Sequence, residues 1–260
     1  QDFDLQFWGL YGQKKELIGP LSGELYFLGL NEDDDPLERE TANRNIYTSG
    51  FRFFVEPQPG SFDFDIEGGL QFGSRRATSL SSDTKKLDVW AQFLHAGIGR
   101  TFADRWQSRA AIEFDYFSGD ETPNDGGFNS FDGLFGPVAG ELAPTSLFTL
   151  LTRTNLVSFA ARFDSRLSTR ISAKASYRAA FLASSRAPFG VSGVVDPTGS
   201  SGRFAGHLFE IGIGYDILSD HVKLTAGAAV FINGEFIKNA PNASGFGDPL
   251  YTYMQVSFNL

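Results

Sequence analysis

Charged and other polar side chains recur at every second position in several segments of this chain. Asp63 and Asp65 alternate with apolar residues in FDFDIEGGLQF, and Arg170 and Lys174 do the same in RISAKASYRAAF. Carboxylate and guanidinium groups gathered on one face can hold a hydrophilic solute through charge-assisted hydrogen bonds, or keep a passage filled with water. The spacing predicts β-strands, because successive side chains of a strand point to opposite faces of its sheet.

The charged positions of these alternating segments are the candidate contacts to a solute. Both signs are present, so these residues do not form a uniformly cationic wall. Any water-filled barrel also needs a polar lining, which is the plainer role for the same residues. The candidates are Arg52, Asp63, Asp65, Glu67, Arg109, Glu113, Asp115, Arg162, Asp164, Arg170, Lys174, Arg178, Glu210 and Lys223.

Other chemistries find weaker support in the sequence. The acidic run NEDDDPLERE could bind Ca²⁺, but it lacks the ligand spacing of an EF-hand and favours a solvated loop. His95, His207 and His221 share no metal-ligand spacing, and no serine stands at a recognisable spacing from a histidine. We therefore predict no catalytic residues, no metal site, no cofactor and no enzyme activity.

Composition narrows the class of protein. The chain has 260 residues, a formal net charge of −9 and no cysteine, and aromatic residues make up 15% of it. The acidic balance argues against a nucleic-acid partner, and a chain without cysteine has no disulfide framework. No apolar run reaches the roughly 18 residues of a transmembrane helix, and we expect any signal peptide to have been removed. These features suit a bacterial outer-membrane barrel, although a soluble all-β protein shares them.

A period of two dominates the chain, and no helical segment of useful length competes with it. We expect a single domain over residues 1–260, built from about eleven strands. The strands span residues 2–11, 21–30, 46–56, 61–73, 87–102, 105–118, 154–166, 169–182, 205–217, 221–233 and 249–260.

The connections between these strands alternate between short and long. EPQPGS, TFADRW, SRLSTR and DILSDH are tight turns, whereas links such as NEDDDPLERETANRN and SSRAPFGVSGVVDPTGSSGR are long and polar. Transmembrane barrels alternate short periplasmic turns with long extracellular loops, and a soluble sandwich has no reason to do so. A soluble barrel of this size would also need a large dry interior. We therefore predict a transmembrane antiparallel β-barrel in a bacterial outer membrane, with apolar faces towards lipid and charged faces towards a wet lumen.

The direction of the strands predicts that part of the barrel lies upstream of this sequence. If the tight turns are periplasmic, the last strand ends on that side, and the link GQKKELIGP is periplasmic too. Counting back, strand 2–11 begins outside, whereas bacterial barrels have an even number of strands with both ends periplasmic. We expect further N-terminal strands; the alternative is that one strand is missed or wrongly split.

Residues 114–136, FDYFSGDETPNDGGFNSFDGLFG, resemble the strand-and-loop signature of the alginate-export outer-membrane porin family. The matching positions are Ser118, Gly119, Asp120, Asn124, Asp125, Gly126, Phe131, Asp132, Leu134 and Phe135. RTNLVSFAARFDSRLSTRISAKASYRAAFLAS and HLFEIGIGYDILSDHVKLTAGAAVFINGEF resemble later strands of that family, so the likeness covers about residues 85–260. The resemblance implies a barrel of about 18 strands that exports an anionic polysaccharide.

The aromatic loop after strand 105–118 needs a buried place for its rings. We expect it to fold into the barrel mouth as a constriction or gate, with Phe128, Phe131, Asp132 and Phe135 as its candidate residues. The predicted function is an outer-membrane channel for a hydrophilic, anionic or saccharide solute. The alternative is a structural barrel of an envelope assembly without an open pore. The expected partners are outer-membrane lipid, the solute, and periplasmic or envelope proteins.

Overall fold

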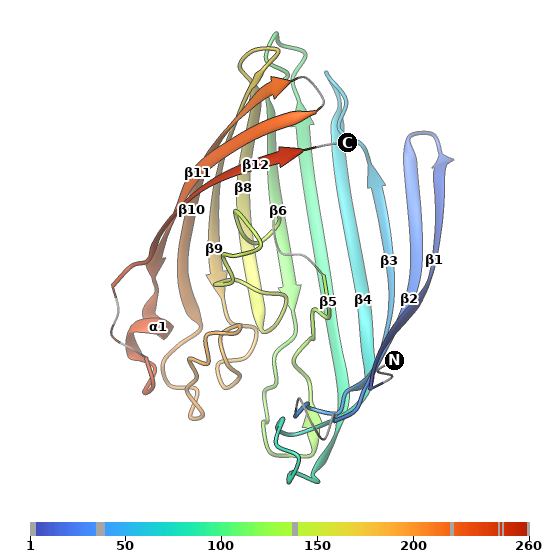
Figure 1. Cartoon of the computed structure of the whole chain (residues 1–260), viewed down its shortest axis with the longest axis vertical. Helices are drawn as coiled ribbons and strands as arrows, with labels where there is room; N and C mark the ends of the chain where they lie inside the picture. Colours follow the sequence, from blue (N-terminus) through green and yellow to red (C-terminus); the bar gives the residue numbers. More distant parts are fainter. Residues whose placement is uncertain are drawn as a thin grey trace.

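The structure is a computed structural model, and it describes residues 4–34, 40–136, 140–218, 221–243, 245 and 247–258. These residues form one sheet that curls around loop segments in its interior (Figure 1). The long strands neighbour one another in chain order, and each is antiparallel to the next. The predicted all-β architecture is confirmed.

Most of the long strands lie where the alternation of side chains placed them. The long strands of the described chain are β1 (Leu5–Ile18), β2 (Leu21–Glu32), β3 (Asn45–Val55), β4 (Phe62–Arg76), β5 (Lys86–Thr101), β6 (Arg109–Phe117), β8 (Leu156–Arg166), β9 (Ile171–Phe181), β10 (Phe204–Leu218), β11 (Val222–Asn233) and β12 (Leu250–Phe258). The short strand β7 (Gly127–Phe128) pairs in parallel with β5, and helix α1 (Glu235–Asn239) follows β11. None of the described helices is long and apolar enough to cross a membrane.

Strand β1 extends well beyond its predicted range of 2–11. The segment GQKKELIGP is not a separate link, because β1 continues to Ile18 and a tight turn then leads directly to β2. The pairing register shifts between Lys14 and Ile18, where Glu16 has a φ of 51°. Such a bulge interrupts the alternation of faces without ending the strand, which explains why the sequence pattern stopped short.

The two faces of the sheet differ in character. On β4 the outward Phe62, Ile66 and Leu70 are exposed, whereas the inward Asp63 and Gln71 are buried. The contrast recurs on other strands and leaves a broad apolar surface outside the curl. In a membrane this surface contacts lipid, so the fold needs no second sheet to cover it.

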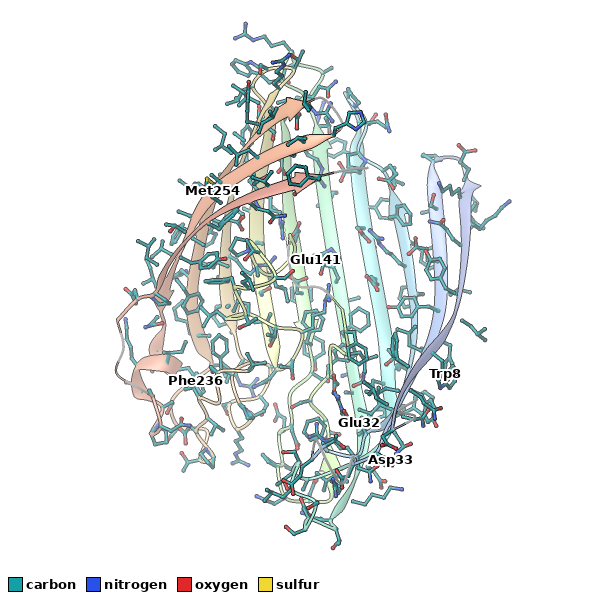
Figure 2. All side chains as sticks on the ribbon, viewed as in Figure 1. Trp8, Glu32, Asp33, Glu141, Phe236 and Met254 are labelled. Atoms are coloured by element: carbon teal, nitrogen blue, oxygen red, sulfur yellow. The ribbon has the colours of Figure 1, made fainter. Side chains whose placement is uncertain are left out.

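Aromatic rings form a belt on the outer face of the first five strands. Trp8, Phe27, Tyr47 and Phe72 come from β1 to β4, and neighbouring ring centroids lie 5.9–6.4 Å apart. Trp90 on β5 is the Cα partner of Phe72 and extends the belt. Figure 2 shows Trp8 at the lower end of the sheet, on the side of the long loops. Aromatic belts of this kind mark the interface between membrane and water.

Short and long connections alternate along the sheet. Short ones follow β1, β3, β5, β8 and β10, and long ones follow β2, β4, β6, β9 and β11. The long loops therefore gather at one end, which is the lower end in Figure 1. This confirms the alternation expected from the sequence and gives the sheet the topology of an outer-membrane barrel.

The interior near the long loops is filled by a packed apolar cluster. Phe131, Leu142 and Leu151 enter it from the β6–β8 loop, Phe189 from the β9–β10 loop, and Phe236 from α1. They pack against inward side chains at the ends of the strands. The wet, charged lumen expected from the sequence is interrupted at this end, because the loops bring their own apolar residues inside.

Strands β1 and β12 form the two edges of the sheet. Among the described residues, β1 pairs with β2 alone and β12 with β11 alone, so the two edge strands do not pair with each other. Whether upstream strands complete the barrel, and whether the whole has about 18 strands, stay predictions.

Candidate functional site

One register row of inward side chains crosses the sheet from β1 to β8. Neighbours in the row are Cα partners on adjacent strands, because each strand contributes the residue that its pleat turns inward. A polar group occupies every position of this inner row, which consists of Gln13, Glu24, Arg52, Glu67, His95, Asp115 and Ser158.

The inner row borders a cavity of about 710 Å³, called the central cavity below. Its walls come from β1 to β6, from β8 and from the β6–β8 loop. Six of the sequence-predicted candidates for the lining of a pore reach it: Arg52, Asp65, Glu67, Glu113, Asp115 and Arg162.

Arg52 lies between carboxylates of the neighbouring strands. Its Nε is 2.9 Å from Asp65 Oδ1, and its Nη1 is 3.8 Å from Glu24 Oε2. Glu67, the next residue of the inner row, accepts a hydrogen bond of 2.6 Å from the hydroxyl of Tyr26. The guanidinium of Arg52 is therefore bound by carboxylates that belong to the barrel wall itself.

A second cluster of ion pairs surrounds the buried Arg178. The guanidinium contacts Asp115, and its Nη2 lies 3.3 Å from Glu113 Oε2. His95 Nδ1 is 2.7 Å from the other oxygen of Asp115, and Arg162 Nε is 2.8 Å from Glu113. Buried charges are tolerated only when they are paired and hydrogen-bonded, and these groups satisfy one another.

A smaller cavity of about 520 Å³ lies towards the short connections. At its wall, Arg109 Nε is 3.0 Å from Asp63 Oδ2, and Lys174 Nζ is 2.5 Å from Glu210 Oε1. Some predicted candidates near this end make no ion pair within the described part of the chain: Asp164, Arg170 and Lys223.

Two predicted constriction residues are aromatic side chains held by the wall. Phe131 is buried, and its ring centroid lies 4.9 Å from that of Phe93 and 5.8 Å from that of Phe117. Phe128 belongs to β7, and the guanidinium of Arg75 lies 4.1 Å from its ring centroid. These contacts fix the first part of the β6–β8 loop.

The other two predicted constriction residues bridge the loop to β1, to β4 and to Arg44, which precedes β3. Phe135 is 56% exposed, and its ring meets that of Phe7 edge-on with centroids 5.1 Å apart. Asp132 accepts a hydrogen bond of 2.8 Å from Arg44, and its backbone N–H donates to Gln71 Oε1 over 2.9 Å. The loop thus spans the interior between distant strands.

Backbone carbonyls of the β6–β8 loop bind arginines of the wall. Arg178 Nη2 donates to the carbonyl of Glu141 over 2.8 Å, and Arg162 donates to the carbonyls of Gly140 and Glu141. The side chain of Glu141 pairs with Arg153 further along the loop. Figure 2 shows Glu141 inside the curl. Two wall residues are thereby tied to the inserted loop.

Several anchors of the loop were not among the sequence candidates: Arg44, Gln71, Glu141 and Arg153. Gln71 lies on the polar face of FDFDIEGGLQF, so the alternation itself could have included it. The side chains of Glu141 and Arg153 lie in an irregular segment, where no period indicates which residues point inward.

Several carboxylates in the long loops have lowered pKa values, and Asp196 and Asp34 are two of them. Hydrogen bonds from Thr198 and Ser201 hold the pKa of Asp196 far below its ordinary value. A hydrogen bond from Arg76 lowers the pKa of Asp34 in the β2–β3 loop. Both groups organise loop backbone, and neither faces the central cavity.

Within the described ranges, no group of three or more histidine, aspartate or glutamate side chains is placed to hold a metal ion. His95 pairs with Asp115, and His207 Nδ1 lies 2.9 Å from the hydroxyl of Tyr177. The acidic run at 31–40 lies partly outside the described residues, since 35–39 are not among them.

The model of the alginate export family matches residues 1–246 of the chain. This span covers most of the sequence, so the chain belongs to that family. A search of curated proteins found no match. The family consists of outer-membrane porins that act as transport channels, and it is not a family of enzymes. The chain is therefore an outer-membrane β-barrel protein of the export-channel type.

Proposed function

We propose that this member of the alginate export family passes a hydrophilic solute, a saccharide or an anion, along the charged inner face of its barrel. The observation that carries the proposal is the inner row, which places a polar group on each strand from β1 to β8, apart from β7, beside a cavity of about 710 Å³. A polar lining of this kind keeps water and hydrophilic solutes in a lumen whose outer wall meets lipid.

We assign the lining of the pore to the charged candidates around the two cavities, and we assign its constriction to the β6–β8 loop. The loop lies inside the curl (Figure 1), and its carbonyls at Gly140 and Glu141 accept hydrogen bonds from Arg162 and Arg178. A solute must pass this loop or displace it. Phe131 supports the same role, since it anchors the loop in the apolar cluster.

A structural barrel without an open pore is the second candidate function. The observation in its favour is the apolar cluster, in which residues of two long loops and of α1 fill the interior at one end. A packed core of this kind excludes water as the interior of a soluble domain does. The two functions differ in whether ions cross the membrane through the protein.

Planar-bilayer recordings of the full-length protein test the proposed function. We expect stepwise ionic conductance, because a hydrated, charged lumen conducts ions wherever the loop leaves a path. Protein unfolded in urea before reconstitution is the control, and it should give no steps. A correctly folded protein that never conducts would favour the structural barrel instead.

A further inference from the structure

We propose that the central cavity is a subsite for an uncharged, hydroxyl-rich saccharide and that it disfavours polyuronates. The inference rests on the proposed function and narrows the class of its solute. The chemistry comes from three features of the cavity: its balance of charge, the engagement of its arginines and its aromatic walls.

The balance of charge in the central cavity is acidic. Three arginines line it, Arg52, Arg153 and Arg162, together with His95. The carboxylates that line it outnumber them and are Glu24, Asp65, Glu67, Glu113, Asp115, Asp132 and Glu141. Arg44 and Arg178 pair with some of these from the cavity's margin, and the carboxylates remain in excess even when both are included. A polyanion entering here meets like charges, which oppose binding.

The arginines of the central cavity are already bonded to carboxylates of the protein. Arg52 holds Asp65, Arg162 holds Glu113, and the remaining arginine, Arg153, holds Glu141. A solute carboxylate needs the planar fork of a guanidinium for bidentate recognition. To obtain it here, a uronate would have to displace an internal carboxylate and leave that charge without its partner.

Glu24 and Glu67 are the carboxylates left mainly to neutral donors. Glu24 accepts a hydrogen bond of 2.9 Å from Gln13, and Glu67 accepts its hydrogen bond from the hydroxyl of Tyr26. The nearest guanidinium nitrogen of Arg52 stands 3.8 Å from Glu24, beyond hydrogen-bonding distance. Both carboxylates have further lone pairs that suit the hydroxyl groups of a sugar.

Exposed aromatic rings complete the cavity. Phe7 is 48% exposed, Tyr11 63% and Phe135 56%, and all three line the same cavity as Glu24 and Glu67. Ligand sites combine apolar and aromatic walls with a few placed polar groups, which matches this arrangement. The apolar faces of a sugar ring can lie against the aromatic rings while its hydroxyls reach the carboxylates.

Calorimetric titration of the full-length protein in detergent micelles tests the inference with two probes of equal length. A neutral glucose hexasaccharide should bind at least about tenfold more tightly than a uronic acid hexasaccharide, a ratio equal to about 1.4 kcal/mol. Equal binding, tighter binding of the uronate, or binding of neither probe would overturn the inference. Binding is measured here without a bilayer. A protein that binds the neutral sugar but conducts no ions would therefore contradict the proposed function and leave the further inference intact.

The variant Glu67→Gln separates charge from shape. It keeps an acceptor for the hydroxyl of Tyr26 and removes one negative charge, so the preference for the neutral hexasaccharide should shrink several-fold through tighter uronate binding. Glu56→Gln is the matched control, since Glu56 is an exposed carboxylate that lines neither cavity. If Glu67→Gln shifts the ratio no more than Glu56→Gln does, the central cavity does not set the selectivity. The wild-type comparison stands even if a variant fails to fold.

Discussion

Arg178 joins the wall of the barrel to the loop inside it. With 5% of its side chain exposed, its guanidinium contacts Asp115, Glu113 and the carbonyl of Glu141. Arg178→Met retains much of the volume but leaves two carboxylates close together without this cation. We expect the free energy of unfolding to fall by about 3–5 kcal/mol, as when one partner of a buried ion pair is removed. Urea unfolding in lipid vesicles, followed by tryptophan fluorescence, measures the change.

Arg166→Met is the control for this substitution. Arg166 lines the smaller cavity from the end of β8, but its side chain is exposed and makes no ion pair among the residues that the structure describes. Exposed substitutions of this kind change stability by no more than about 0.5 kcal/mol. If the two variants lose the same stability, Arg178 contributes no more than an exposed charge, contrary to the expectation.

At the scale of elements, the β6–β8 loop is the segment that we propose narrows the passage. It crosses the interior from the end of β6 to the start of β8 and carries Phe131, Leu142 and Leu151 into the apolar cluster. Replacing residues 121–152 by a short glycine-serine linker removes this material from the lumen. Because conductance rises with the open cross-section, we expect a several-fold larger single-channel conductance in planar bilayers.

Shortening the β4–β5 loop at 77–85 is the matched control. Most of these residues are exposed, and none of them lines the central cavity. This variant should conduct like the unaltered protein. An unchanged conductance in the β6–β8 variant, with folding verified by heat-modifiable electrophoretic mobility, would show that the loop does not narrow the passage.

The sequence predicts these elements unequally, for physical reasons. Asp63 and Asp65 alternate with apolar residues, so the inward face of β4 follows directly from the pleat of a strand. The bulge at Glu16 breaks this alternation, and the end of β1 was therefore missed. The contacts of Glu141 could not be predicted, because the path of an irregular loop depends on where Leu142 packs, which no local period encodes.

At the scale of the whole molecule, the two edges of the sheet set the conditions for a barrel. The long strands from β1 to β12 are eleven in number within the described chain, and each is antiparallel to the next. An odd number of such strands makes β1 and β12 run in the same direction. In hydrocarbon, an unpaired backbone N–H or C=O costs several kcal/mol, so both edges must be covered in the membrane.

Direct pairing of β1 with β12 would be parallel, whereas bacterial barrels close with antiparallel strands in even number. We therefore predict that β1 and β12 do not pair with each other and that further strands cover these two edges. Cysteine pairs test this in the full-length protein, and the 260 residues contain no cysteine of their own. Leu10 is combined in turn with Thr252, Met254 or Val256, the outward positions of β12. Oxidation of membranes with copper phenanthroline is followed by electrophoresis.

Leu10 with Phe27 is the control pair, because these residues are Cα partners on β1 and β2 and should be cross-linked. A disulfide needs Cβ atoms about 3.5–4.5 Å apart, so intervening strands would prevent cross-linking between β1 and β12 altogether. An efficient disulfide from Leu10→Cys to any of the three β12 positions would contradict the prediction. The barrel would then close through its own edge strands in parallel, and the lumen would be bounded by the residues described here. Failure of those pairs, with the control pair cross-linked, would mean that additional strands enlarge the lumen and add their inward side chains to its charge.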